Sequence, residues 1–160
     1  MPCLLIVICL LYCDSKHKNI SDQTMNQKKE HQFLQAKPVW LKGRETEKNL
    51  ILGFRKCFDR PQKKEVVVKI TAATIYRAFL NGQFLGCGPA RAAHGFYRID
   101  EWNLSNKLKK GINVLAIEVA GYNANSYYLL DQPSFLQAEI VADGLVLCAT
   151  ESSEIGRAHV

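Results

Sequence analysis

Several features that mark common activities are scarce or absent in this sequence of 160 residues. It has four histidines, which are too few and too scattered to form a cluster of metal ligands. Its net charge of +6 comes partly from isolated pairs such as Lys63-Lys64 and Lys109-Lys110. Nucleic-acid binding would need a basic stripe with interleaved aromatic residues, so we expect no nucleic-acid partner. No Gly-x-Ser-x-Gly nucleophile elbow is present.

Long hydrophobic runs are also absent, and the first apolar run, Cys3–Tyr12, is too short to span a bilayer. Its length is that of an export signal, so residues 1–13 are predicted to be a signal peptide or a lipoprotein signal. In the second case Cys13 would carry a lipid, which would be the chain's membrane contact. No Lys or Arg precedes the run, and a buried apolar strand is the alternative. We expect export to the periplasm, the outer membrane or the exterior, with residues 14–35 as a flexible spacer.

No long stretch has the 3.6-residue period of an amphipathic helix, but from Pro38 onward apolar residues recur with period two. Alternation of this kind predicts strands with one core face and one wetter face. The clearest segments are 66–70, 76–80, 115–119 and 136–140. Phe54–Phe58 is predicted to be another strand, with Lys56 marking a bulge. Leu145–Ala149 is predicted to be the last strand.

The turn chemistry agrees with many short antiparallel strands. Asn81-Gly82 and Asp143-Gly144 each separate two strand-like segments and predict type I′ hairpin turns. Between Trp102 and Lys110 one short helical turn is expected, with Ser105 as its cap. The predicted turn residues are Asn81, Gly82, Gly88, Pro89 and Gly111. The sequence therefore predicts an all-β fold, an antiparallel β-sandwich or jelly roll, over residues 36–150.

Removal of the first 13 residues would leave Cys57, Cys87 and Cys148, whose spacing is unlike that of a metal site. We interpret these three cysteines as small core residues. If the chain is exported, a disulfide could join two of them, but the sequence does not identify the pair. At the C-terminus, Ile155–Val160 resembles the translation of a sequencing adapter, so residues 154–160 are predicted to be an artefact. A genuine polar tail is the alternative.

A set of motifs runs along the predicted strands: Trp40, Phe54-Arg55-Lys56-x-Phe58, Ile70-Thr71-Ala72, the hairpin Tyr76–Pro89, Tyr97-Arg98-Ile99-Asp100 and Lys110–Val119. Together these motifs resemble the N-terminal β-sandwich domain of bacterial α-L-rhamnosidases over about residues 38–144. The hairpin and the Lys-Gly-x-Asn strand recur in many galactose-binding-like sandwiches. Gly88-Pro89-Ala90-Arg91, directly after the hairpin, favours the rhamnosidases.

The resemblance implies that the parent protein is an exported glycoside hydrolase whose catalytic carboxylates lie in a helical toroid. No segment here corresponds to that toroid, so this chain is expected to be a non-catalytic accessory domain. The implied partners are a rhamnose-containing polysaccharide or the missing catalytic domain of the same chain. We expect no cofactor, although some related modules bind rhamnose with calcium, whose ligands cannot be assigned here. A free-standing carbohydrate-binding module or lipoprotein is the alternative function.

Glycoside hydrolysis usually needs two carboxylates on either side of the scissile bond. Asp100 and Glu101 are adjacent and would point to opposite faces of a strand, while Glu118 and Glu139 occupy outward positions. No spacing forces two of these groups together, so they are predicted to be surface or turn carboxylates. Asp100 is expected to accept backbone hydrogen bonds in a turn.

Two loop segments carry the mixture of aromatic and polar side chains that suits a sugar. The candidate sugar-binding residues are Arg91, His94, Tyr97 and Trp102 in the first segment and Asn125, Tyr127, Tyr128 and Asp131 in the second. Loops at one end of a sandwich often carry binding residues. Aromatic residues also fill sandwich ends and domain contacts. Sugar binding, domain packing and a structural role therefore all remain open for these residues.

Overall fold

A computed structural model describes residues 32–93, 96–126, 129 and 131–151 of the chain. From Phe33 onward these residues belong to one compact unit. The predicted signal, the lipidation candidate Cys13 and the predicted artefactual tail all lie outside the described residues. None of the described segments is a helix long and apolar enough to cross a membrane.

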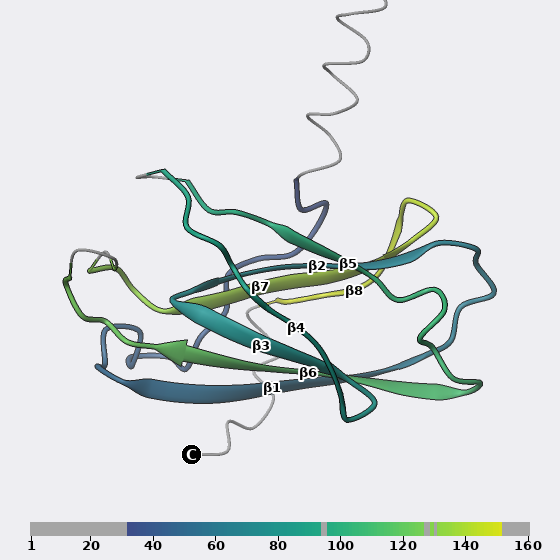
Figure 1. Ribbon diagram of the computed structural model, residues 1–160, viewed down its shortest axis with the longest axis horizontal. Coiled ribbons are helices and arrows are strands. Elements are labelled where there is room, and N and C mark those ends of the chain that lie inside the picture. Colours follow the sequence, from purple (N-terminus) through teal and green to yellow (C-terminus); the bar gives the residue numbers. More distant parts are fainter. Residues whose placement is uncertain (1–31, 94–95, 127–128, 130, 152–160) are drawn as a thin grey trace, which may run out of the picture. The chain divides into compact units, whose positions relative to one another are not determined.

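The described residues form two antiparallel sheets that pack face to face (Figure 1). The strands are β1 (Leu50–Asp59), β2 (Val66–Ala73), β3 (Ile75–Leu80), β4 (Gln83–Gly88), β5 (Asp100–Asn103), β6 (Ile112–Gly121), β7 (Phe135–Ala142) and β8 (Leu145–Ala149). One sheet has the order β1-β6-β3-β4 and the other the order β5-β2-β7-β8. This arrangement confirms the predicted all-β sandwich.

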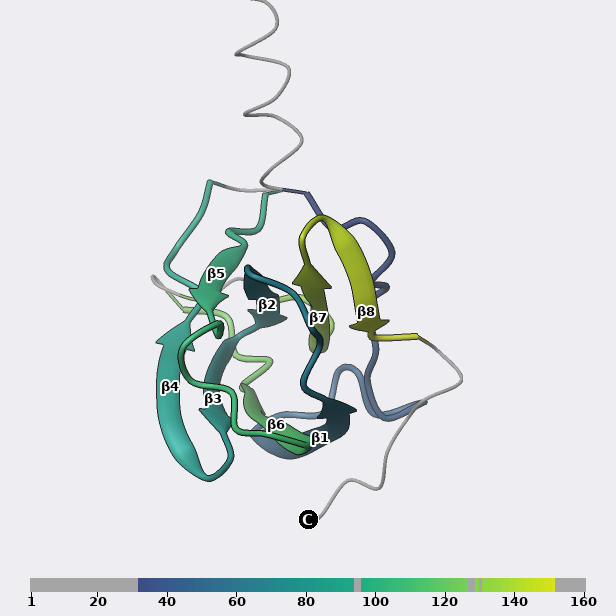
Figure 2. The same ribbon diagram turned by 90° about the vertical axis from the view of Figure 1, so that its right-hand side faces the viewer.

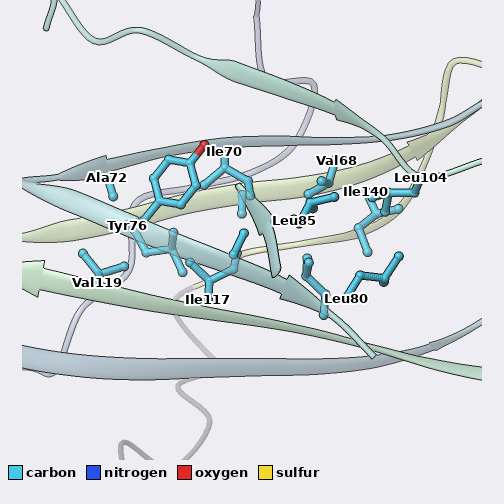
Figure 3. Close-up of a cluster of buried hydrophobic side chains, with 14 of the residues drawn as sticks. Val68, Ile70, Ala72, Tyr76, Leu80, Leu85, Leu104, Ile117, Val119 and Ile140 are labelled. Atoms are coloured by element: carbon cyan, nitrogen blue, oxygen red, sulfur yellow. The ribbon is translucent and has the colours of Figure 1, made fainter. Parts of the chain in front are cut away.

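The core lies between the sheets and follows from the alternation in the sequence. In β2, Val66, Val68 and Ile70 point inward and are almost fully buried. They meet inward residues of β3 and β6, among them Tyr76 and Ile117 (Figure 3). Each fully buried branched aliphatic side chain stabilises the fold by about 2 kcal/mol relative to exposure. The period-two pattern therefore specifies which face of each sheet becomes the interior.

Both predicted hairpin turns are confirmed by the backbone. Asn81 and Gly82 have φ angles of 53° and 83°, and Asp143 and Gly144 have φ angles of 45° and 80°. Positive φ at both central positions is what a type I′ turn requires. The side-chain oxygen of Asn81 also accepts a hydrogen bond from the Val114 backbone at 3.0 Å, which joins the hairpin to β6.

Lys56 does not mark a bulge, because β1 keeps an unbroken register with β6 from Leu50 to Asp59. The register shifts lie instead between Ala78 and Phe79 and between Ile140 and Val141. Lys56 interrupts the alternation for a different reason. It occupies an inward position of β1 and lines a cleft at the edge of the sandwich, where its aliphatic stem can lie on apolar surface.

The segment after β5 forms a single hydrogen-bonded turn. The amides of Lys107 and Leu108 donate to the Leu104 carbonyl, at 2.8 and 3.2 Å. The prediction of Ser105 as its cap was wrong. Asn103 takes that role by accepting a hydrogen bond from the Ser105 amide at 2.9 Å. The Ser105 hydroxyl instead accepts from the backbone of Val66, because the turn lies against the start of β2.

The interpretation of the three cysteines as core residues was wrong for two of them. Cys57 and Cys87 are exposed free thiols, and Cys148 is half-buried against the core. Cys57 has the same parity in β1 as Arg55, and Cys87 lies opposite Arg77 in the neighbouring strand. Both thiols therefore belong to the outer face of the β1-β6-β3-β4 sheet.

The sandwich has two unlike flanks (Figure 2). On the closed flank, the edge strands β4 and β5 lie side by side and side chains bridge the sheets. On the open flank, β1 and β8 end their respective sheets. A cleft of about 90 Å³ lies there between the two sheets.

Candidate functional site

The two predicted loop segments meet at one end of the sandwich. The Tyr97 hydroxyl donates a hydrogen bond to the Gln132 side-chain oxygen at 2.9 Å. The Tyr97 ring meets the Phe135 ring edge to face, with centroids 4.8 Å apart. Figure 1 shows the β4–β5 and β6–β7 loops at this same end. Because Tyr97 and Gln132 come from different loops, their hydrogen bond fixes one loop against the other.

Exposed aromatic rings gather on these loops. Phe96 is 74% exposed and Tyr97 is 47% exposed, and Tyr122 at the end of β6 is also exposed. We call the described side chains Phe96, Tyr97, Tyr122 and Gln132 the aromatic end. Arg91, Asn125 and Asp131, which are predicted sugar-binding residues, are exposed on the same loops. His94, Tyr127 and Tyr128 lie outside the described residues.

The base of the second loop is held by a buried amide. The Asn123 side chain is 5% exposed and donates to the Glu47 carbonyl at 2.8 Å and to the Ser134 hydroxyl at 2.7 Å. Ser134 in turn packs against Gly121, where a Cβ would lie 2.2 Å from its hydroxyl oxygen. These contacts anchor both ends of the loop that carries Asn125 and Asp131.

Trp102, a predicted sugar-binding residue, belongs to a different cluster on the closed flank. Its indole N–H donates to the Tyr76 hydroxyl at 2.9 Å. That hydroxyl donates to the Asp100 carboxylate at 2.7 Å. Burial raises the pKa of Tyr76, so the phenol stays protonated and can act as donor and acceptor at once. Trp102 therefore packs against the core rather than joining the aromatic end.

Two glycines make room for this cluster. A Cβ on Gly86 would lie 2.2 Å from the Trp102 ring, and a Cβ on Gly88 would lie 1.9 Å from an Asp100 carboxylate oxygen. Any larger residue would collide with a packed group, so the Gly86-Cys87-Gly88 run is needed for close approach. Asp100 also pairs with Arg98 at 3.6 Å. Asp100 thus holds a phenol and a guanidinium, instead of the backbone amides predicted for it.

The other carboxylates also have structural partners. Glu101 lies 3.6 Å from the Lys69 ammonium, which confirms that it points away from Asp100. Glu118 pairs with Arg77 at 2.6 Å on the outer sheet face. Among residues 32–93, 96–126, 129 and 131–151, no three His, Cys, Asp or Glu side chains gather as metal ligands. Glu101 and Glu118 are thus engaged in ion pairs within the sandwich.

Glu139 was predicted to be a surface carboxylate, and this was wrong, because its side chain is buried with 1% exposure. It occupies the outward position of β7 as expected, but the segment 33–36 covers it. The amides of Leu34, Gln35 and Ala36 donate to its oxygens over 2.9–3.1 Å. Charge-assisted hydrogen bonds to backbone amides of this kind are stronger than neutral ones.

Sequence reasoning overlooked Tyr76 and Phe135, which organise the two clusters. Alternation assigns Tyr76 to the core face of β3, but it does not show that its hydroxyl would bridge Trp102 and Asp100. Phe135 begins β7 on the outward face, opposite Ala73. Because Phe135 lies at the start of β7, next to the β6–β7 loop, its position in the sequence could have indicated a contact with a loop side chain such as Tyr97.

Comparison with known proteins gives the fold a context. A scan against protein-family models and a search of curated proteins find no match. Among solved structures, the fold is similar to small parts of two rhamnosidases. The chain is similar to part of the GH78 family rhamnosidase of Bacillus sp. GL1, with 31% sequence identity and a TM-score of 0.70. The match covers 75% of this chain and 13% of that chain.

A second similarity, to the alpha-L-rhamnosidase from Dictyoglumus thermophilum, has 16% identity and a TM-score of 0.52. It covers 63% of this chain and 12% of that chain, and it supports the fold alone. The chain thus spans only a small share of the length of these enzymes.

Proposed function

We propose that this chain is a non-catalytic accessory domain of an α-L-rhamnosidase-like glycoside hydrolase that recognises carbohydrate with its aromatic end. The observation that carries the proposal is the similarity to a GH78 rhamnosidase at 31% identity over 75% of this chain but only 13% of that enzyme. A small sandwich within a much longer hydrolase has room for binding residues but not for the whole catalytic apparatus.

The chemistry of the aromatic end suits a sugar. Sugar rings present apolar C–H faces that pack on aromatic rings, and hydroxyl groups that need hydrogen-bonding partners. Tyr97 is held by Gln132 and Phe135, yet half of its surface stays accessible. A ring that is already positioned loses little entropy when a ligand stacks on it. The exposed Arg91, Asn125 and Asp131 side chains supply donors and acceptors on the same loops.

Two of the carboxylates, Glu139 and Asp100, are held by structural contacts. Glu139 is buried under backbone amides, and Asp100 is held by Tyr76 and Arg98. A general acid and a nucleophile must both reach a glycosidic bond. These two groups are each engaged in a contact that stabilises the sandwich.

The proposal extends to the setting of the domain. Export would follow from the predicted signal in residues 1–13, with a rhamnose-containing polysaccharide or the catalytic domain of the same chain as partner. Calcium would enter only as an additional ligand at the sugar site. The alternative function is a free-standing carbohydrate-binding module or lipoprotein, and continuation of the source gene into a long helical region distinguishes the two.

The test is a titration of the chain with L-rhamnose and with a rhamnose-containing polysaccharide, with and without calcium, followed by intrinsic fluorescence and calorimetry. Tyr97→Ala is expected to weaken binding about tenfold, because about 1.4 kcal/mol of stacking and hydrogen bonding is lost. Phe84→Ala is the matched control, since Phe84 is an exposed ring on β4. No binding in any condition would exclude sugar recognition, and turnover of an aryl rhamnoside would exclude a non-catalytic role.

A further inference from the structure

The end of the sandwich opposite the aromatic end collects positive charge from loops that are far apart in the sequence (Figure 1). Four connections between strands meet there, at residues 60–65, 81–82, 104–111 and 143–144. Two of these connections carry six exposed cations, which are Arg60, Lys63, Lys64, Lys107, Lys109 and Lys110. We call these six side chains the basic end. In the sequence they are separate pairs and single residues, and the fold brings them to one surface.

Hydrogen bonds fix the backbone that carries these cations. The Arg60 guanidinium donates to the Leu108 carbonyl at 2.9 Å, and the Arg60 amide donates to the Gly111 carbonyl at 3.0 Å. The Asn113 side chain is fully buried, accepts a hydrogen bond from the Lys109 amide at 3.0 Å and donates one to the Lys109 carbonyl at 3.0 Å. The two loops are therefore joined before any ligand binds, and binding would order side chains rather than backbone.

The positive charge of the basic end is not neutralised by the carboxylates around it. Three carboxylates lie at this end, Asp59, Glu65 and Asp143, so six cations and three anions leave a charge of +3, half of the chain's net charge of +6. In the part of the chain that the structure describes, none of the six cations lies within ion-pair distance of a carboxylate, whereas Lys69 pairs with Glu101 in the middle of a sheet. The excess charge is therefore open to an anionic partner.

Exposed apolar side chains lie beside the same turns. Phe84, Ile112 and Leu145 are 61%, 62% and 62% exposed, and each follows a glycine with positive φ by one or two residues. Lysines next to exposed apolar side chains suit an anionic lipid surface, where headgroups meet the ammonium groups and apolar side chains enter the acyl boundary. A soluble polyanion would satisfy the cations alone. A nucleic acid would need stacking rings, and two of these three side chains are aliphatic.

We propose that the basic end docks this domain on an anionic lipid surface, with its six cations at the headgroups and Phe84, Ile112 and Leu145 at the acyl boundary. β6 runs from Ile112 at this end to Gly121 at the aromatic end, a length of about 30 Å. The aromatic end would therefore face away from the membrane, toward a ligand in solution. The inference goes beyond sugar recognition and uses none of the residues of the aromatic end.

Cosedimentation of the whole chain with vesicles of phosphatidylcholine and phosphatidylglycerol in equal parts tests the proposal. Binding should weaken steeply as the ionic strength passes about 0.1 M, where charges are screened over about 10 Å. Joint replacement Lys109→Gln and Lys110→Gln should weaken binding about thirtyfold, since each cation near an anionic surface contributes about fivefold. The matched control, Lys42→Gln with Lys48→Gln, removes the same charge from the loop before β1 at the opposite end and should change binding by about twofold at most.

A second pair of variants tests the apolar contact. Ile112→Ser should weaken vesicle binding about tenfold, because a side chain that enters the acyl boundary is lost. Ile51→Ser is its control, since Ile51 is 59% exposed at the other end of the same sheet, and it should bind like the wild type.

Each other outcome overturns the proposal. Absence of binding, or equal binding to vesicles of phosphatidylcholine alone, would exclude docking on anionic lipid, and neither comparison needs a variant to fold. Equal losses for a variant and its control would remove the basic end from the contact. Tighter binding to soluble polygalacturonate or to single-stranded DNA than to the vesicles would identify an acidic polysaccharide or a nucleic acid as the partner instead. None of these results affects the sugar titration, in which Tyr97 is varied.

Discussion

The closed and open flanks show two ways in which a β-sandwich can treat its sheet edges. On the closed flank, Tyr76 connects Trp102 of β5 to Asp100, and two glycines of β4 let these groups approach. On the open flank, β1 and β8 are separated by an apolar cleft with Lys56 in its lining. The difference shows that side chains join the two sheets across one flank, whereas an apolar cleft lies between them on the other.

The largest expected effect is a difference in folding stability between two glycine substitutions, one on each flank. Gly86→Ala should destabilise the fold by about 3 kcal/mol, because its Cβ would overlap the packed Trp102 ring. Gly53→Ala in β1 has nothing within 4 Å of the new Cβ and should stabilise the fold by about 0.5 kcal/mol through reduced unfolded-state entropy. Urea unfolding followed by fluorescence measures both. Similar losses for the two variants would show that the flanks do not differ in packing.

A smaller effect tests the hydrogen-bonded cluster of the closed flank. Tyr76→Phe keeps the ring but leaves the Trp102 N–H and the Asp100 carboxylate without their shared partner. An unsatisfied group of this kind costs about 2 kcal/mol. Chemical unfolding of Tyr76→Phe at neutral pH measures this loss, and Tyr97→Phe at the exposed aromatic end is the matched control, with a loss of about 0.5 kcal/mol at most.

The same variant should differ from the wild type at high pH. Burial raises the pKa of Tyr76 above its ordinary value of 10.0, so the folded state holds this proton more tightly than the unfolded state. The resulting stability is fully present below pH 10 and is lost as the pH rises toward the folded-state pKa. Unfolding curves above pH 10 should therefore fall more steeply for the wild type than for Tyr76→Phe. Parallel curves would contradict this linkage.

Local patterns in the sequence predicted the strands and turns, but contacts distant in the chain decided the roles of several side chains. Alternation identified the core rows, and Asn-Gly and Asp-Gly identified the hairpins. The alternation of side chains along β1 also places Cys57 on the outer face with Arg55. The prediction that Cys57 is a core residue relied instead on its small apolar side chain. The role of Trp102 depends on Tyr76, which lies 26 residues away, and no local pattern encodes that contact.

Glu139 shows the same limit and provides the smallest of the expected effects, near the open flank. Its outward position in β7 was predictable, but its burial depends on a segment more than 100 residues earlier in the chain. Glu139→Gln should destabilise the fold by about 1.5 kcal/mol, because one acceptor oxygen and the negative charge that hold the amides of Leu34, Gln35 and Ala36 are lost. Hydrogen exchange should show these three amides losing protection before β7 itself does. Glu118→Gln removes an exposed ion pair with Arg77 and should cost at most about 0.5 kcal/mol. If both variants lose equal stability and the three amides stay protected, the segment is held by its backbone hydrogen bonds to β7 and Thr150 rather than by the buried carboxylate.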